Sequence, residues 1–430
     1  MIKTKIINFF ERNYFFIIFF FYLTIFYDLY YDQSISFTYS KHDYEYHLRF
    51  IYLFKDNSIF ESLKLYGKEG YEVRNSPIFY IIYGFLNKYL SLDILQKLNT
   101  IVSALIAFVF FKCLKIKYIS YSNIFLTLLA CVIFTSPTLR SLSVWPYPLI
   151  WGIFFFIISI YYFLRFKTAP IKKKFIFSVY TTIFIAFASY IQPTLSLFNI
   201  FYLVSFYKIF KNKKLFSYIL LINFFFVVPV FFFFTQIDFL FFYKAEGLEI
   251  SKLKSINIFN KIIIITTIIL YFILPAINLF ELYKELLRKI NFKIIVYASL
   301  ITIFFSFFFN YEFSTSFGGG FVHKASYLLF KNYIFLFLFF LLSILILYSI
   351  FNDKINNYLI YSIFIITNIQ YTIYNKYYDI LVLIVFFLLA DVNFNKFFFK
   401  KKYSLLYLYL LYLSYYILVD YKNYFYNLFL

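Results

Sequence analysis

The chain has 430 residues, of which 63% are hydrophobic and 14% are charged, and its mean hydropathy is +0.78. A soluble domain carries roughly 45–50% apolar residues, so this composition excludes a soluble globular protein. The net charge of +21 would favour nucleic acid as a partner of a soluble domain. Here the Lys clusters lie between apolar runs, which indicates retention on the cytoplasmic side of a membrane instead.

The apolar runs have the length that a helix needs to cross a bilayer, and the strict alternation of a membrane barrel is absent. The sequence therefore predicts an all-α fold, a polytopic transmembrane helical bundle of about 12 to 14 spans. We expect a single integral membrane domain over residues 1–430, located in a bacterial inner membrane.

The first apolar run, 14–31, follows a basic N-terminus that we place in the cytoplasm. Residues 32–76 then form the first extracytoplasmic loop, with short amphipathic helices on the membrane surface. Two full crossings between residues 76 and 114 would put Lys112 and Lys117 outside, so we expect 77–92 to enter the membrane without crossing it. The basic connections on the inner side are 165–174, 208–214, 284–293 and 396–402, and the segments placed outside are 136–147, 236–257 and 311–327.

The outer loop contains the sequence HDYEYH, which places His42, Asp43, Glu45 and His47 within six residues. Asp43 and His47 are four residues apart, so they share one face of a helix. A carboxylate just above the bilayer can act as a general base, and an imidazole can donate to phosphate or sugar oxygens. The alternative interpretation is a solvated polar loop with incidental histidines.

Metal binding at this loop has weaker support. The chain has no HExxH or CxxC spacing, so no catalytic zinc site is expected. No cofactor is predicted, although a divalent ion held by Asp43 or Glu45 beside a phosphate stays an open alternative.

The only glycine-rich run, SFGGGFVHKAS, covers Ser316 to Ser326. Its glycines let backbone amides approach an anion, and His323 and Lys324 add donors. The run lacks the GK[ST] ending of a nucleotide-binding loop, and a flexible connector is the alternative.

Two further segments on the predicted outer side carry basic residues. Lys376 and Asp379 begin an apolar run, where they either mark function or form a local ion pair. Arg140 lies beside Trp145 at another outer turn. It either contacts a lipid phosphate or anchors the turn at the interface.

These segments, in their order along the chain, resemble the C-type (GT-C) glycosyltransferases, and most of all the dolichyl-phosphate-glucose alpha-1,2-glucosyltransferase family. The family's D-E-x-F-H motif is similar to Asp43-Tyr-Glu-Tyr-His47, with Tyr44 in the place of the second acid. Four later family motifs are echoed by Ser76-Pro77-Ile-Phe-Tyr80, Gln192-Pro-Thr194, Gly319-Gly-Phe-Val-His323 and Lys376-Tyr-Tyr378.

The resemblance implies an enzyme that moves a sugar from a polyprenyl-phosphate carrier to the hydroxyl of a lipid-linked or protein glycan on the outer face. It implies catalytic roles for Asp43 as the general base, with Glu45 and His47. The basic residues that we expect to contact phosphate are Arg74, Arg140, His323, Lys324 and Lys376.

Two other functions stay open. A polymerase or ligase of surface polysaccharide would depend on basic residues of large outer loops, above all Arg140 or Arg74. A lipid or glycan transporter (flippase) would show related halves and broken helices around polar residues at the membrane midplane. The polar residues of this chain gather at one face instead, which disfavours transport.

Overall fold

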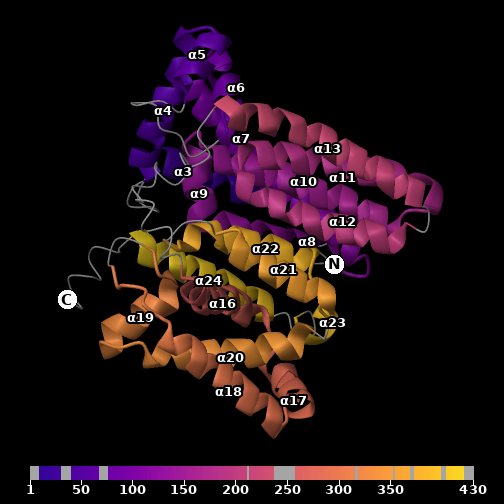
Figure 1. Ribbon diagram of the computed structural model, residues 1–430, viewed down its shortest axis with the longest axis vertical. Coiled ribbons are helices and arrows are strands. Elements are labelled where there is room, and N and C mark those ends of the chain that lie inside the picture. Colours follow the sequence, from indigo (N-terminus) through magenta and orange to yellow (C-terminus); the bar gives the residue numbers. More distant parts are fainter. Residues whose placement is uncertain are drawn as a thin grey trace. The chain divides into compact units, whose positions relative to one another are not determined.

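The computed structural model describes residues 9–30, 40–66, 76–210, 213–236, 257–314, 318–351, 354–368, 372–398 and 403–420. These residues form helices joined by short turns and contain no strand, which confirms the all-α class. Contacts divide the chain into two compact units, Met1–Ile250 and Ser251–Leu430, within what the sequence predicts as one membrane domain (Figure 1).

Six described helices are long and apolar enough to cross a membrane, and the number rises to eight if each of two bent pairs is one span. The chain is therefore an integral membrane protein. Fewer described helices than the predicted 12 to 14 have the length of a full span. Four further apolar helices have only 10–17 residues. The six long helices are α7 (Leu92–Lys117), α10 (Pro148–Thr168), α11 (Ile171–Ile191), α13 (Lys213–Gln236), α16 (Ile258–Ile273) and α20 (Ile334–Phe351).

The bent pairs break where the chain turns sharply. In the first pair, α8 (Asn123–Cys131) continues into a short 3-10 helix and then meets α9 (Pro137–Val144) at 70°. In the second pair, α17 (Leu279–Lys289) meets α18 (Phe292–Phe307) at 102°. Pro137 suits the first turn of α9 because its missing N–H would have no partner there.

Within unit 1, α7 and α10 run in the same direction. Near their N-termini the Trp151 indole donates to Asn99 Oδ1 at 3.2 Å, and further along Cys113 Sγ approaches the Ile157 carbonyl at 3.9 Å. The helix α12 (Phe198–Ile209) runs the same way as α10, and α11 and α13 return in the opposite direction (Figure 1).

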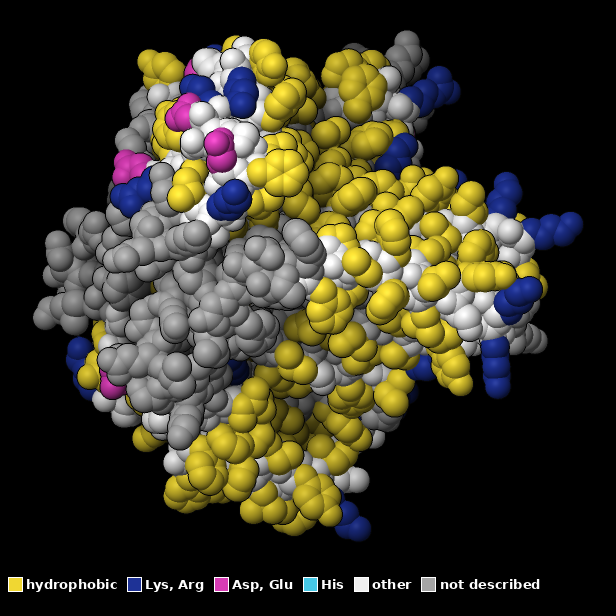
Figure 2. Space-filling model, turned by 45° about the horizontal axis from the view of Figure 1, so that its top comes forward, with side chains coloured by type: hydrophobic (Ala, Val, Ile, Leu, Met, Phe, Trp, Pro, Cys, Tyr) yellow, Lys and Arg dark blue, Asp and Glu magenta, His cyan; other side chains and the backbone are white. Residues whose placement is uncertain are grey.

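This alternation collects the basic residues at one end of unit 1, which we call the basic end. The C-termini of α7, α10 and α12 and the N-termini of α11 and α13 all lie there. In Figure 2, Lys and Arg side chains project beyond a mainly hydrophobic surface at this edge. The basic end comprises Lys112, Lys115, Lys117, Arg165, Lys167, Lys172, Lys173, Lys174, Lys208, Lys213 and Lys214.

The first helices are α2 (Phe15–Leu23) and α3 (Ile25–Tyr30). They run from the basic end to the opposite end, and α2 packs antiparallel to α7. Lys112 Nζ donates to the Tyr14 hydroxyl at 2.8 Å, while further along Tyr22 shares a 3.0 Å hydrogen bond with Thr100 on α7. The opposite end carries α4 (Ser40–Asp56), α5 (Ile59–Leu65) and α6 (Ile78–Asn87).

The helix α6 is too short to span a bilayer by itself, and whether residues 77–92 enter the membrane stays a prediction. Its ten residues extend about 15 Å, against about 30 Å for a bilayer core. The helix packs tightly on α4 because Gly84 has no side chain. A Cβ atom at Gly84 would lie 2.7 Å from the Cβ of Phe54 and 2.9 Å from the carbonyl oxygen of Ile51.

Unit 2 is built around α16, which contacts helices from most of the unit. Its neighbour α22 is buried along its whole length, since none of the ten residues of α22 is exposed. The remaining elements of unit 2 are the 3-10 helix η3 (Leu274–Ala276), α19 (Gly320–Phe330), α21 (Ile355–Ile366), the 3-10 helix η4 (Asn375–Tyr377), α22 (Asp379–Leu388), α23 (Phe394–Phe397) and α24 (Tyr403–Asp420).

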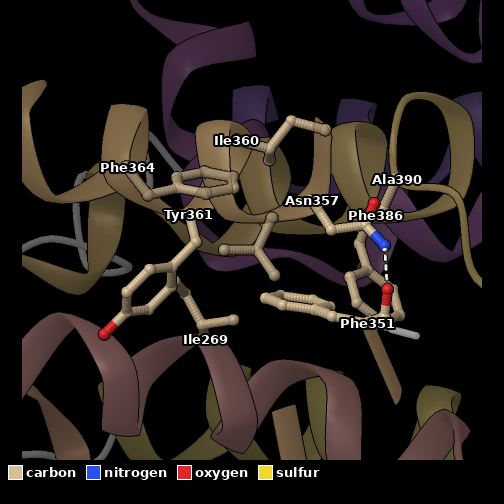
Figure 3. A pocket seen from close by; sticks show the side chains of 9 residues that line it. Ile269, Phe351, Asn357, Ile360, Tyr361, Phe364, Phe386 and Ala390 are labelled. Carbon is tan, nitrogen blue, oxygen red and sulfur yellow. Dashed lines mark hydrogen bonds between the residues drawn. The ribbon is translucent and has the colours of Figure 1, made fainter. Parts of the chain in front are cut away.

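A small apolar pocket lies between α16, α20, α21 and α22 (Figure 3). Its polar groups are already engaged. The Asn357 amide donates to the Phe351 carbonyl at 2.9 Å, and the Tyr361 hydroxyl lies 2.5 Å from Thr266 Oγ1. The free volume of about 10 Å³ holds about one water molecule, so we interpret the pocket as a packing void.

Candidate functional site

The helix α4 carries the HDYEYH sequence at the end of unit 1 opposite the basic end. His47 is 3% exposed. Its Nδ1 lies 2.5 Å from the Tyr80 hydroxyl in a hydrogen bond, and its ring meets the Tyr147 ring edge to face at 4.4 Å. His47 therefore connects α4 to α6 and to the start of α10.

The rest of the HDYEYH sequence divides between a buried and an exposed side of α4. Tyr44 is buried against Trp145, with ring centroids 4.9 Å apart, and burial raises the pKa of its phenol well above the ordinary value. Glu45 is exposed. Asp43 belongs to α4 one turn before His47, but its side chain lies outside the described part of the structure.

A buried amide fixes the turn beneath α4. The Nδ2 of Asn99 donates to the carbonyl oxygens of Leu142 at 2.7 Å, Ser143 at 3.1 Å and Trp145 at 3.0 Å. Its Oδ1 accepts from the Tyr83 hydroxyl at 3.2 Å. The amide satisfies the C-terminal carbonyls of α9, which have no partner within the helix, and holds the turn that carries Trp145.

Arg140 forms an ion pair inside unit 1. Its Nε lies 2.6 Å from Asp28 Oδ2, and the two side chains are 11% and 2% exposed. The guanidinium also donates to Thr24 Oγ1 at 3.0 Å and to the Thr24 carbonyl at 2.8 Å. The Arg140 donors are thus engaged by Asp28 and Thr24 within the protein, which is a structural role that neither of the two predicted roles described.

The glycine-rich segment in unit 2 makes a turn that only glycine accepts readily. Gly318, Gly319 and Gly320 have φ angles of +59°, +88° and +73°, in the left-handed region that a Cβ atom disfavours. A Cβ atom at Gly318 would collide with the Tyr311 hydroxyl, and one at Gly319 would collide with His323 Nδ1. The turn leads directly into the N-terminus of α19.

His323 sits behind this turn in an aromatic enclosure. The ring is 1% exposed and stacks on Tyr333 at 5.0 Å, with the Tyr311 ring edge-on at 5.2 Å. Within the described residues no well-formed hydrogen bond reaches either ring nitrogen, and the Tyr311 backbone makes only a weaker polar contact with the ring. Burial, assisted by Lys324, lowers the pKa of His323 to about 4, and the nearby Tyr311 backbone opposes this only in part. The imidazole is therefore neutral at pH 7.

The segment 372–379 packs against the glycine turn. The backbone N–H of Ile373 donates to the Tyr311 hydroxyl at 3.2 Å. A Cβ atom at Gly320 would lie 3.5 Å from Asn375 Oδ1, a buried oxygen that has no hydrogen-bond partner in the described residues. Two segments that the sequence singled out separately, SFGGGFVHKAS and the one around Lys376, are thus brought together.

The two lysines near the glycine turn are more exposed than the aspartate of the same region. Lys324 and Lys376 are half-buried, and the Lys376 ammonium lies 5.2 Å from the Tyr374 ring centroid in a cation–π contact. Asp379 is completely buried, and its backbone carbonyl accepts from the Tyr412 hydroxyl at 2.7 Å.

The structure places the predicted site residues in two groups. Glu45, His47 and Arg140 belong to unit 1, and His323, Lys324 and Lys376 belong to unit 2. Arg74 lies outside the described residues. Within the described ranges, no group of three His, Cys, Asp or Glu side chains could hold a metal ion.

Sequence analysis missed a buried cation on α16. Lys261 is 6% exposed and donates from Nζ to the Asn368 carbonyl at 2.6 Å. The signal was present, because an ionisable residue inside an apolar span marks a functional or structural site by default. Asn375 carried no such local signal, and Tyr80 stood out only as the tyrosine of the Ser76-Pro77-Ile-Phe-Tyr80 motif.

The fold and this set of residues define a polytopic α-helical membrane protein with histidines buried near polar turns. No family model, curated protein or solved structure matches the chain.

Proposed function

We propose that this protein is a GT-C-type membrane glycosyltransferase that moves a sugar from a polyprenyl-phosphate carrier to an acceptor hydroxyl. The observation that carries the proposal is the polarity of unit 1, with basic residues at one end and the HDYEYH helix α4 at the other. Cytoplasmic loops are enriched in Lys and Arg. On this basis α4 faces the outside, which is the periplasm if the host membrane is a bacterial inner membrane.

In this proposal Asp43 is the general base. It removes the proton of an acceptor hydroxyl, the oxygen attacks the anomeric carbon, and the bond from that carbon to the carrier phosphate breaks with inversion. His47 keeps this turn of α4 in place through its hydrogen bond to Tyr80. Glu45, which is exposed on the same helix, is a candidate contact for the acceptor sugar.

We assign the carrier phosphate to His323, Lys324 and Lys376. The support is local to unit 2. The N-terminus of α19 follows three glycines with positive φ, an arrangement in which backbone N–H groups can cradle an anion. His323 lies directly behind this turn, since a Cβ atom at Gly319 would collide with its Nδ1. The hydrophobic bundle would hold the polyprenyl chain.

The test is the rate of sugar transfer by Asp43→Asn protein in nanodiscs supplied with a polyprenyl-phosphate hexose and a glycan acceptor. Loss of a general base should reduce the rate by about 10² to 10⁴. Asp56→Asn is the matched control, because Asp56 is an exposed acid at the far end of the same helix. Transfer at an unchanged rate by correctly folded Asp43→Asn protein would refute the role of the base.

The competing functions give different results in the same preparation. A polysaccharide polymerase or ligase would lose activity through Arg74 or Arg140 while Asp43 stayed dispensable. The ion pair of Arg140 with Asp28 supports the transferase over this alternative. A flippase would move labelled carrier across a proteoliposome membrane without transferring its sugar.

A further inference from the structure

The helix α17 exposes apolar side chains in a single stripe, although it is one of the most highly charged helices. Five of its eleven residues are charged. At 100° per residue, the four large exposed apolar residues fall within about 100° of the helix circumference, the width of one amphipathic face. These residues, the α17 stripe, are Leu279 (66% exposed), Phe280 (57%), Tyr283 (58%) and Leu287 (66%).

The opposite side of α17 is fixed to the rest of unit 2 by charge. Glu285 is 2% exposed, and its carboxylate pairs with Lys396 at 2.5 Å and with Lys289 at 3.4 Å. Lys289 also donates to the Ser349 carbonyl at 2.8 Å. Because the acid faces inward and is neutralised there, the stripe cannot turn toward the protein without breaking these contacts.

The orientation of α17 follows from its neighbour. It makes an angle of 102° with α18, which is apolar along its length and exposes large side chains over most of its surface. If α18 runs across the bilayer, α17 lies close to the membrane plane. The exposed large hydrophobic side chains of α18 are Phe292, Ile295, Val296, Tyr297, Leu300, Ile301, Ile303, Phe304 and Phe307.

We propose that α17 is an interfacial helix that buries its stripe among lipid acyl chains at the headgroup boundary. Two basic residues border the stripe on one side, Lys284 and Arg288. The Lys284 ammonium lies 4.2 Å from the Phe280 ring centroid, so its stem follows the apolar face while the charge can reach the headgroups. An apolar face with flanking basic residues fits a bilayer that contains anionic lipid.

The proposal is tested with single spin-labelled cysteines in a Cys113→Ala/Cys131→Ala background, reconstituted in nanodiscs of phosphatidylcholine and phosphatidylglycerol. Leu287→Cys and Tyr283→Cys probe the stripe. Arg288→Cys, one residue farther round the same helix, is the matched control. Leu300→Cys on α18 marks a deeper position. The measurement is the collisional accessibility of each label to oxygen and to a water-soluble nickel chelate.

We expect both stripe labels to favour oxygen over the chelate, at a depth of about 5–10 Å, and the Arg288→Cys label to favour the chelate. Stripe labels as accessible to the chelate as the control would overturn the proposal. Dipolar broadening between labels on different molecules would also overturn it, because the stripe would then bind a second copy of the chain. The result does not depend on whether the protein transfers sugar.

Discussion

Among the described residues, His47 and His323 are both buried, but their imidazole nitrogens have different surroundings. His47 in unit 1 is 3% exposed and bonds to the Tyr80 hydroxyl. His323 in unit 2 is 1% exposed, yet in the described part of the chain neither ring nitrogen makes a well-formed hydrogen bond. Burying a polar group without a hydrogen bond is costly, so such groups are uncommon in a stable core. His47 therefore joins α4 to α6, whereas His323 is held mainly by the aromatic rings around it and by the glycine turn.

The segments around the two histidines are also stabilised by different kinds of interaction. The end of unit 1 around α4 is held by specific polar contacts, including the Asn99 amide and the ion pair of Arg140 with Asp28. The turn around His323 is held by backbone shape, because three glycines adopt positive φ angles. Four predictions test this contrast, and all of them concern the stability of purified protein in detergent.

The largest effect is expected for Arg140→Met. This change leaves the Asp28 carboxylate buried without its cation, which typically costs 3–5 kcal/mol. Thermal unfolding of the variant measures the loss. Lys97→Met is the control, because the Lys97–Asp93 pair is 57% and 64% exposed and such pairs contribute about 0.5 kcal/mol or less. Equal losses in the two variants would show that the end of unit 1 is not held by its buried charges.

Gly319→Ala should be the next most damaging change. The new Cβ atom would adopt φ +88° and collide with His323 Nδ1, and a left-handed non-glycine residue alone costs about 1–3 kcal/mol. We expect a total loss of about 3 kcal/mol. The double variant Gly319→Ala/His323→Ala should recover part of it by removing the collision. A destabilisation of less than about 0.5 kcal/mol would contradict a turn held by backbone shape.

The pH dependence of stability should distinguish His323 from other groups. Its pKa is lowered to about 4 in the folded protein, against about 6.5 when unfolded. Between these values the unfolded chain binds more protons, so stability falls as the pH falls from about 6.5 toward 4. The expected contribution is about 3 kcal/mol. The free energy of unfolding should therefore fall more steeply with decreasing pH in the natural chain than in His323→Gln. If the two proteins lose stability in parallel, the pKa of His323 is ordinary.

The smallest effect concerns Tyr80→Phe. Removing the hydroxyl leaves the Nδ1 of His47 buried without that hydrogen bond, which costs about 1–2 kcal/mol. The control Tyr89→Phe removes a hydroxyl from a residue that is 75% exposed and should change the unfolding temperature little. If both variants unfold like the natural chain, the hydrogen bond between His47 and Tyr80 does not contribute to stability, and the contrast with His323 is lost.

The helical membrane class could be read from the sequence because hydropathy is a local property that adds up along each run. The regular spacing of the basic segments could also be read from the sequence. In the structure the basic segments of unit 1 lie at one end of that unit, because α7, α10 and α12 run parallel to one another. The number of full-length spans could not be read in this way. Where a helix bends or stops depends on packing, as at the 70° break between α8 and α9 and at the short helix α6.

The sequence by itself determined which residues are candidates for a site, including HDYEYH and the glycine run beside His323, since rare polar residues stand out in an apolar chain. Only the tertiary structure decided their partners. Arg140 meets Asp28, His47 meets Tyr80, and the glycine turn meets Asn375. These pairs are distant in sequence, and each exists because burial forces a polar group to find whichever partner the packed helices bring within reach.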